Sequence, residues 1–545
     1  MRKIIIGAVI VSLITTPWVS SDALIIPKII VLACLSSFLL PELIKMVVNQ
    51  IPSKKLKILT ILSIIFVIQM LVSAFKSAAP FEQQFFGVTG RGLGFITYFS
   101  LFIIMLYTAF KITYSDLSKI SYGLLISCSL SSVYSILQFF GYDFSDWRTQ
   151  TNGIIGTIGN PNFQSSFVAI AFLPTIVYLW NTKIRILLIS LFSLILLFTL
   201  YICESTQGYI ALATSSAVFI LIYLWYKQAK FIFIGALLTT TLTGSLAVAG
   251  MLNHGPLSHF LYKVSVRSRG EMWQTATAMI SNNKLFGVGL DSLGDYSLKY
   301  RNKKTATGIA EYIDNCHNFF LQFAATGGVL LAICYVAVIL LSLFSFYRIQ
   351  RSMGKFDETL AALLAAWVSF QLQSLISPAA MPTLIWNFIL CGAFVGLGGL
   401  YESNTSPIEI KPTRIKINSR NSIVNIVGVI TAIFAFALTI PLFNADKLAR
   451  QADIKKDASL AIKAANTYPK SVIRFNRLGG GLYESRLYDL SLEIGRSAVK
   501  FNPNNYQTWI LILLNPKATS EERNIAKQAL IQIDPYNDEI KNYKF

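Results

Sequence analysis

Apolar runs of about 20 residues recur along most of this chain, and they restrict the fold more than any other feature of the sequence. As a helix, a run of about 20 apolar residues crosses the roughly 30 Å hydrocarbon core of a membrane. About thirteen such runs occur in the 545 residues, near 4–20, 24–48, 57–76, 91–110, 119–140, 163–180, 184–203, 208–226, 230–252, 317–347, 359–377, 382–402 and 422–443. The sequence therefore predicts an all-α, polytopic membrane bundle.

Composition and charge support this prediction. The chain is 54% hydrophobic and only 14% charged, with a mean hydropathy of +0.56, which is too apolar for an ordinary soluble protein. The net charge of +20 does not indicate a nucleic-acid partner, because Lys and Arg lie mostly in short loops between apolar runs, as expected for loops retained in the cytoplasm. Five of the six cysteines fall inside apolar runs and no CxxC pair occurs, so we expect them to be packing residues.

The alternation of basic loops predicts an orientation. With the N-terminus in the cytoplasm, the Lys and Arg clusters all fall in inside loops, while the outer loops before residue 253 hold almost none. The first apolar run lacks a clear small-x-small cleavage site and is expected to be a retained helix. We therefore expect a membrane domain over 1–443 in the cytoplasmic (inner) membrane, with a large loop, 253–316, on its outer face.

The chain from 444 to 545 is more polar, and we expect it to be a soluble domain on the same outer face. Three similar phrases recur in it, and their prolines, Pro469, Pro503 and Pro535, are 34 and 32 residues apart. This spacing is close to the period of about 34 residues of tetratricopeptide repeats. The pattern predicts such a helical repeat, with a plain helical hairpin as the alternative, and a role in docking a partner protein.

The stretch 253–328 is the long polar interruption of the apolar pattern. It contains all three histidines and many basic residues, which on an outer loop depart from the charge rule and favour an anionic partner. Arg269 and Trp273 lie four residues apart in SRGEMW, where Ser268 is expected to cap a helix start. A helix N-terminus and a guanidinium together suit a diphosphate. The alternative is an Arg and a Trp that anchor the loop at the lipid headgroups.

Histidine 317 stands where this stretch re-enters the membrane, next to Asn318. A neutral histidine at such a boundary can act as a general base, although a capping or interfacial role is also open. His254 and His259 lack a third ligand at metal spacing, so no zinc site is predicted.

Four further segments fall on the same expected face or within the polar stretch. They are the glycine-flanked Arg91, GTIGNPN before the run at 163, STQG with Gln207, and the turn sequence FGVG at 286–289. Arg91 could instead reach the lipid headgroups, and GNPN and FGVG could be plain turns, whereas the polar residues of STQG could line a cavity.

In this order, these segments, with CHNFFLQFAATGG around His317, resemble the O-antigen ligase and polymerase superfamily of bacterial membrane glycosyltransferases, over roughly residues 80–350. The resemblance implies a fold of the GT-C-like kind and a metal-independent, inverting transfer without a cofactor. The donor would be an undecaprenyl-diphosphate-linked glycan and the acceptor a hydroxyl of a polysaccharide, lipid or protein. Several relatives similarly carry tetratricopeptide-like repeats after the last span.

By motif position, the resemblance implies that Arg269 binds the diphosphate and that His317 activates the acceptor. Arg91 would be an additional diphosphate contact, with help from Arg267. Trp273, Asn318 and Gln207 would complete the substrate-binding set. Many relatives have an arginine where this chain has Gln207, which leaves the second phosphate-binding arginine of the family in question.

Three alternative functions remain. The first is a protein O-oligosaccharyltransferase, which would share the motifs and differ in its acceptor. The second is a transporter of lipid-linked glycans, which the scarcity of charges at mid-span disfavours. The third is a membrane anchor for the C-terminal repeats without catalysis.

Overall fold

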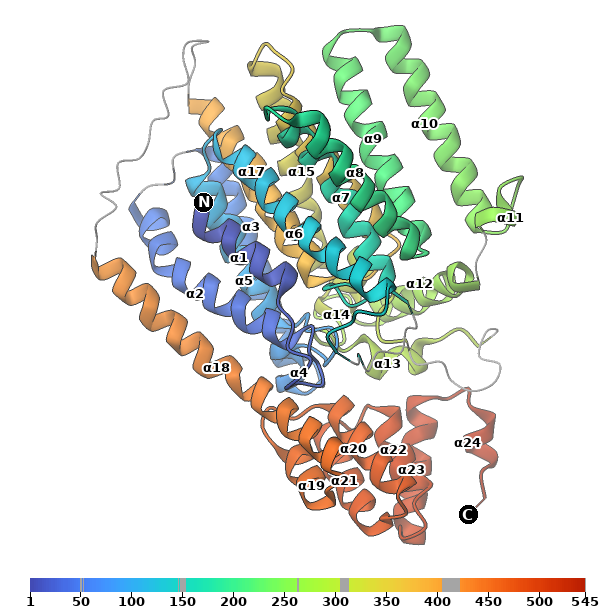
Figure 1. The fold of residues 1–545 in the computed structure, drawn as a ribbon. Coiled ribbons are helices and arrows are strands. Elements are labelled where there is room, and N and C mark those ends of the chain that lie inside the picture. Colours follow the sequence, from blue (N-terminus) through green and yellow to red (C-terminus); the bar gives the residue numbers. More distant parts are fainter. Residues whose placement is uncertain are drawn as a thin grey trace.

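The computed structural model describes residues 1–49, 51, 53–145, 147, 153–261, 264–303, 313–403 and 422–544, and every regular element in these ranges is a helix (Figure 1). The all-α prediction is thus confirmed. The first helices are α1 Arg2–Leu13, α2 Ile26–Asn49, α3 Lys54–Lys76, α4 Phe81–Phe86, α5 Phe95–Lys111, α6 Asp116–Phe139, α7 Pro161–Trp180, α8 Arg185–Ile202, α9 Thr206–Tyr226 and α10 Lys230–Met251. Next come α11 Ser258–Leu261, α12 Val264–Asn282, α13 Leu293–Tyr300, α14 Phe319–Gly327, α15 Val329–Ser352, α16 Glu358–Gln373, α17 Met381–Ser403 and α18 Ser422–Lys455. The C-terminal helices are α19 Ala458–Asn466, α20 Val472–Glu484, α21 Tyr488–Phe501, α22 Tyr506–Leu513, α23 Ser520–Ile533 and α24 Asp538–Asn542.

Each of the expected apolar runs coincides with a helix, but not each helix is long enough to be counted as a span. Within the described residues, ten helices have the length and hydropathy to cross a membrane: α2, α3, α6, α7, α8, α9, α10, α15, α17 and α18. The helices α1, α5 and α16, with 12, 17 and 16 residues, are shorter. The expected count of about 13 spans is therefore not confirmed, whereas a multi-pass membrane protein is.

The run expected at 317–347 differs from the prediction because it contains two helices. α14 ends at Gly327 and α15 begins at Val329, and Gly328 between them has a φ of 89°. Glycine adopts this left-handed backbone without the steric penalty that a Cβ would bring. The break separates α14, which carries the His317 segment at its N-terminus, from the long span α15.

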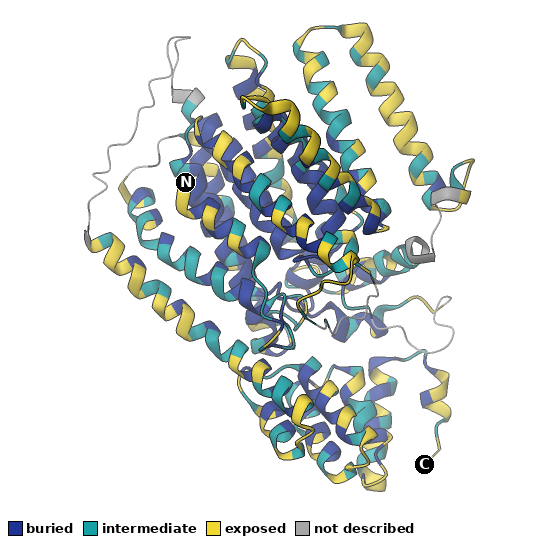
Figure 2. Ribbon diagram, in the orientation of Figure 1, coloured by how far each residue is buried: buried dark blue, intermediate teal, exposed yellow. Residues whose placement is uncertain are grey.

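The core of the membrane part is built around α17, whose apolar segment is 94% buried (Figure 2). α17 packs closely on α5, because Gly392 and Gly396 lie one helical turn apart and face the carbonyl oxygens of Met105 and Ala109. Two small residues at this spacing let two helix backbones approach each other. By contrast, the apolar segment of α10 has no buried residues and stands at the edge of the bundle.

The C-terminal helices form a second body below the membrane bundle, and α18 joins the two (Figure 1). α18 has 34 residues and continues without a break past position 444 to Lys455. A small apolar core, which includes Phe475, Leu478 and Ile494, holds α18 to α21 together. The prediction of a helical region after the last span is confirmed. That these helices are tetratricopeptide-like repeats remains a prediction.

Helices α4, α12, α13 and α14 lie between the two bodies, and α13 contacts the C-terminal body through polar groups. The buried carboxylate of Asp295 accepts hydrogen bonds from Gln83 of α4 at 2.8 Å, and from Asn502 at 2.9 Å and Asn505 at 2.8 Å. At the end of α13, Arg301 forms an ion pair with Asp534 at 2.7 Å. We call these four helices and the loops between them the polar layer. The C-terminal body is thus attached to the polar layer, which also carries the predicted site.

Candidate active site

Histidine 317 lies in the short segment before α14 and is held there by backbone contacts. Its φ of 53° is unusual for a residue other than glycine. The Asn315 side chain accepts a hydrogen bond from the His317 backbone N–H at 2.8 Å, and the next residue but one, Phe319, donates its N–H to the Ser374 carbonyl at 2.8 Å. The Nδ1 atom of His317 is buried without a hydrogen-bond partner. A left-handed backbone conformation held by neighbouring groups is a common feature of functional positions.

Arginine 91 reaches the same place from the turn between α4 and α5. Its Nε donates to the Asp314 carboxylate at 2.8 Å, and Asp314 is three residues before His317. Both side chains are partly exposed, at 22% and 39%, so this ion pair remains accessible from solvent. Arg91 is therefore beside the histidine in space, although more than two hundred residues of sequence separate them.

Arginine 269 and Trp273 lie one turn apart on α12, as predicted, but the predicted helix start is wrong. α12 begins at Val264, so Ser268 is inside the helix and does not cap it. No proline lies between Val264 and Ser268, and serine is tolerated in a helix interior, so nothing stops the helix from starting at Val264. Since only the first four N–H groups of a helix are free, Arg269 offers its guanidinium and not a helix N-terminus.

Electrostatics show that Arg269, Arg91 and His317 share one environment. Burial and, to a smaller extent, the charges of Arg269 and Arg91 together lower the pKa of His317 to about 4, while Asp314 acts in the opposite direction. Burial also lowers the pKa of Arg269. The imidazole is thus neutral at physiological pH and lies within the electrostatic reach of two guanidinium groups. Such a site can hold an anion and accept a proton.

Trp273 belongs to the same part of α12, and its indole Nε1 is buried without a hydrogen-bond partner. Buried polar groups usually have partners, so this donor and the Nδ1 atom of His317 are two unused hydrogen-bonding positions in this region. They are consistent with the predicted substrate contacts.

Asparagine 318 has a structural role in α14. Its side-chain oxygen accepts hydrogen bonds from the N–H groups of Phe320 at 3.1 Å and Leu321 at 3.0 Å, so it caps the helix. The capping role that was an alternative for His317 is thus taken by its neighbour Asn318. The predicted substrate contact of Asn318 stays a prediction.

Gln207 lies in the first turn of α9 and is 9% exposed. Its side-chain oxygen accepts a hydrogen bond from Ser377 at 3.4 Å. The segment from Ser374 to Ser377 therefore links Gln207 to the start of α14, because Ser374 accepts the hydrogen bond from Phe319. Among the described residues, Gln207 has no recorded hydrogen bond to His317 itself. Arg267 lies two residues before Arg269 in α12, and its side chain is outside the described residues.

Three residues of the site were missed by the sequence predictions. Asp314 and Asn315 directly precede CHN and hold Arg91 and His317, and Asp291 holds the turn that carries Arg91. Asp314 and Asn315 could have been found as polar neighbours of the histidine. No local signal links Asp291 to Arg91.

The basic excess of the outer loop has a partial explanation inside the chain. Arg301, one of the residues that suggested an anionic partner, is paired with Asp534 of the C-terminal body. Its charge is therefore neutralised by the protein itself, which makes Arg301 a poor contact for an external anion.

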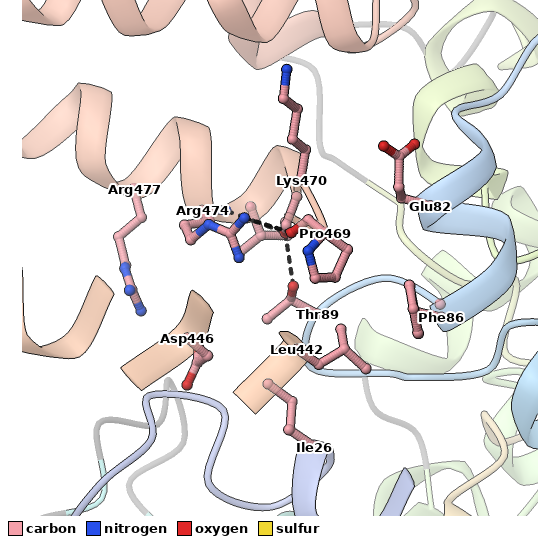
Figure 3. A pocket seen from close by; sticks show the side chains of 13 residues that line it. Ile26, Glu82, Phe86, Thr89, Leu442, Asp446, Pro469, Lys470, Arg474 and Arg477 are labelled. Atoms are coloured by element: carbon pink, nitrogen blue, oxygen red, sulfur yellow. Dashed lines mark hydrogen bonds between the residues drawn. The ribbon is translucent and has the colours of Figure 1, made fainter. Parts of the chain in front are cut away.

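A recess lies away from the histidine, at the seam between the two bodies (Figure 3). It is bordered by α4, the turn after it, α18 and the start of α20, with Thr89 bonded to Ser471 at 2.8 Å. Arg474 beside it donates to the Pro469 carbonyl at 2.6 Å. The bond from Thr89 to Ser471 joins the two bodies, whereas that from Arg474 to Pro469 lies within the C-terminal body. None of the predicted site residues lines the recess.

Among the described residues, no group of three His, Cys, Asp or Glu side chains could hold a metal ion. His254 and His259 lie in the α10 to α11 region, away from α14 in the fold (Figure 1).

Comparison with known proteins gives one family match. Residues 191–336 match the model of a family described as O-antigen ligase, and this range contains all the predicted site residues except Arg91. No curated protein matches the chain significantly. The match implies transfer of a lipid-linked glycan in the membrane. Residues 191–336 are therefore similar to an O-antigen ligase domain, a domain of membrane glycosyltransferases.

Proposed function

We propose that this protein transfers a glycan from an undecaprenyl-diphosphate-linked donor to an acceptor hydroxyl, as a surface polysaccharide polymerase or ligase. The observation that carries the proposal is that Arg91 and Arg269, from two separate segments, both act on the charge of His317, with Arg91 bound to Asp314 three residues before this histidine. The family match over 191–336 supports the reaction class.

In the proposed step, the two guanidinium groups bind the donor diphosphate and stabilise its growing negative charge. The acceptor oxygen attacks the anomeric carbon from the side opposite to the diphosphate, and the bond from this carbon to the diphosphate oxygen breaks. Undecaprenyl diphosphate leaves with the bonding electrons, and the acceptor proton passes to His317. The configuration at the anomeric carbon is inverted, and no metal is required in this scheme.

Donor binding would also strengthen the base. A pKa of about 4 keeps His317 neutral, but it makes the imidazole a weak proton acceptor. A bound diphosphate would offset the charges of Arg91 and Arg269, and this raises the pKa of His317 towards its ordinary value. His317 would thus become a better base only when the donor is in place.

We further propose that the site and the chain after residue 444 lie on the outer face of the cytoplasmic membrane. The alternation of basic loops supports this orientation. The C-terminal body would then be a positioning module, because it contacts α13 through Asp295 and Arg301.

The decisive experiment uses a deletion strain complemented with Arg269→Ala, His317→Ala or the matched control His254→Ala. We expect the first two to abolish the glycan product at normal protein levels in the membrane, and the control to restore it. Normal polymer length and attachment in the His317→Ala strain would refute the proposal. With purified protein, donor and the acceptor identified below, transfer should persist in a chelator such as EDTA.

The glycan-bearing molecule that disappears from the deletion strain identifies the acceptor. Loss of long chains with retained short ones indicates a polymerase, and loss of lipid-attached glycan indicates a ligase. Loss of glycan from proteins indicates a protein O-oligosaccharyltransferase instead.

A further inference from the structure

The turn that carries Arg91 is half glycine and has few hydrogen bonds within itself. It runs from Gly87 to Gly92, and Gly87, Gly90 and Gly92 all have positive φ angles, of 88°, 86° and 64°. Within the turn, the Val88 carbonyl accepts hydrogen bonds from the N–H groups of Arg91 at 2.9 Å and Gly92 at 2.8 Å. Glycine-rich backbone has high conformational entropy when it is not held. A defined position for Arg91 therefore needs contacts from outside the turn.

Asp291 supplies such contacts from a segment two hundred residues away in sequence. Its Oδ2 atom accepts hydrogen bonds from the backbone N–H groups of Val88 at 2.8 Å and Leu93 at 3.2 Å. One carboxylate oxygen thus joins the two ends of the turn. Asp291 is 8% exposed, so these bonds are largely shielded from water. Hydrogen bonds from N–H groups to a shielded carboxylate are stronger than neutral ones.

The turn is also held from its other side. The Asp22 Oδ2 atom accepts a hydrogen bond from the Gly90 N–H at 2.7 Å, and Asp22 precedes α2. The backbone of Asp22 is in turn bonded to Asp446 of α18 at 3.0 Å. Two carboxylates from distant segments therefore fix the turn between them, with Arg91 projecting towards Asp314.

The charge of Asp291 also acts on Arg91. Burial raises the pKa of the Asp291 carboxyl to about 6, while the two N–H groups and the Arg91 guanidinium oppose this rise. At neutral pH the carboxyl is ionised, so it attracts the guanidinium as well as the backbone of the turn.

We infer that Asp291 is a positioning residue for Arg91, and that it holds the guanidinium at the His317 site by joining Val88 to Leu93. This inference rests on the proposed function, because it assumes that Arg91 contacts the donor diphosphate. It also assigns a role to the FGVG sequence, which brings Asp291 to the turn. Gly287 lies so close to the end of α14 that a Cβ would collide with Thr326 and Gly327. At Gly289, a Cβ would collide with the Ser77–Ala79 segment.

Asp291→Asn is the sharpest substitution at this position. Asp291 has a φ of 53°, and asparagine tolerates this left-handed conformation better than most residues, so the backbone can be kept. The substitution removes the charge and weakens the two hydrogen bonds. Loss of one hydrogen bond to a charged group is enough to change an equilibrium constant about tenfold.

The test is a double-mutant cycle on the full chain in lipid nanodiscs, with undecaprenyl diphosphate as the probe. The proteins are the wild type, Arg91→Ala, Asp291→Asn and the double variant. We expect each single variant to raise the Kd about tenfold or more, and the double variant to be no weaker than Arg91→Ala, because Asp291 acts through Arg91. Additive effects in the double variant, or an unchanged Kd for Asp291→Asn, would overturn the inference.

Asp295→Asn is the matched control. It lies four residues further along, is 6% exposed and binds Gln83, Asn502 and Asn505 instead of the turn. We expect its Kd to stay within about twofold of the wild type, since it has no contact with Arg91. A loss equal to that of Asp291→Asn would show a general packing effect and contradict the inference.

Hydrogen exchange over residues 87–94 without any probe separates this inference from the proposed function. We expect the amides of Val88 and Leu93 to exchange about tenfold faster in Asp291→Asn and at the wild-type rate in Asp295→Asn. Unchanged exchange in Asp291→Asn overturns the inference whether or not the probe binds. If the wild type does not bind undecaprenyl diphosphate while the exchange result holds, the proposed function fails and the holding role of Asp291 remains.

Discussion

Removing the Asp534 carboxylate should loosen the C-terminal body from the polar layer that carries the site. Two hydrogen bonds, at 3.0 and 2.9 Å, join Arg301 to this carboxylate in a bidentate pair. The Arg301 side chain is 12% exposed and that of Asp534 is fully buried. Asp534→Ala therefore leaves a largely buried guanidinium without its partner.

The size of the effect follows from this burial. Removing one partner of a buried ion pair destabilises a structure by about 3–5 kcal/mol, and the residual exposure of Arg301 favours the lower end, about 3 kcal/mol. Since about 1.4 kcal/mol corresponds to a factor of ten, the contact between the two bodies should open more than about a hundredfold more often.

Hydrogen exchange of the α13 amides in lipid nanodiscs measures this opening. We expect these amides to exchange at least about a hundredfold faster in Asp534→Ala, with α17 unchanged. Arg496→Ala is the control, because its ion pair with Glu522 has a similar distance of 2.8 Å but a 54% exposed arginine. An exposed pair contributes about 0.2–1 kcal/mol, so exchange should change by less than about fivefold. Equal effects of the two substitutions would refute the burial argument.

Three further predictions concern the site and its supports. Arg269→Gln should raise the pKa of His317 above about 4, because one nearby positive charge is lost. The pKa should stay below 6.5, since burial, the larger cause of the lowering, remains. As the pH falls, His317 should therefore become protonated at a higher pH in the variant than in the wild type. Histidine NMR titration with the other two histidines replaced checks this, and a lower pKa in the variant would contradict it. Asn318→Ala should lower the stability of the protein by about 0.5–2 kcal/mol through loss of the α14 cap, and Asn318→Asp should restore it in thermal unfolding if capping is the main role. Gly287→Ala should destabilise more than Gly354→Ala, because the φ angles are nearly equal, at 65° and 64°, but only at Gly287 would the Cβ collide with the Thr326 backbone; equal melting temperatures would rule this out.

The helical parts of the fold could be predicted because they depend on local properties. Apolar runs form helices in a membrane whatever their neighbours are, since only internal hydrogen bonds can satisfy the backbone there. For this reason each expected run contains helix, although that at 317–347 is divided into two, and the region after residue 444 is helical as expected. The start of α12 was misplaced because a capping signal at Ser268 is weak when nothing stops the helix earlier.

The candidate site could be predicted only in part. Residue chemistry singled out Arg91, Arg269 and His317, and the resemblance to a family ordered them along the chain. Their shared environment, the ion pair with Asp314 and the holding of the Arg91 turn by Asp291 come from packing between segments that are far apart in sequence.

The sequence by itself thus determined that this is a helical membrane protein with a polar, basic interruption before the last spans, because hydropathy and residue chemistry are properties of each segment alone. The tertiary structure decided which charges remain for a ligand. Arg301 is neutralised by Asp534, which is buried in the C-terminal body, whereas Arg91 pairs with a partly exposed Asp314 and acts with Arg269 on the charge of His317. Only the folding of the chain brings these partners within the few ångströms at which charges and hydrogen bonds act.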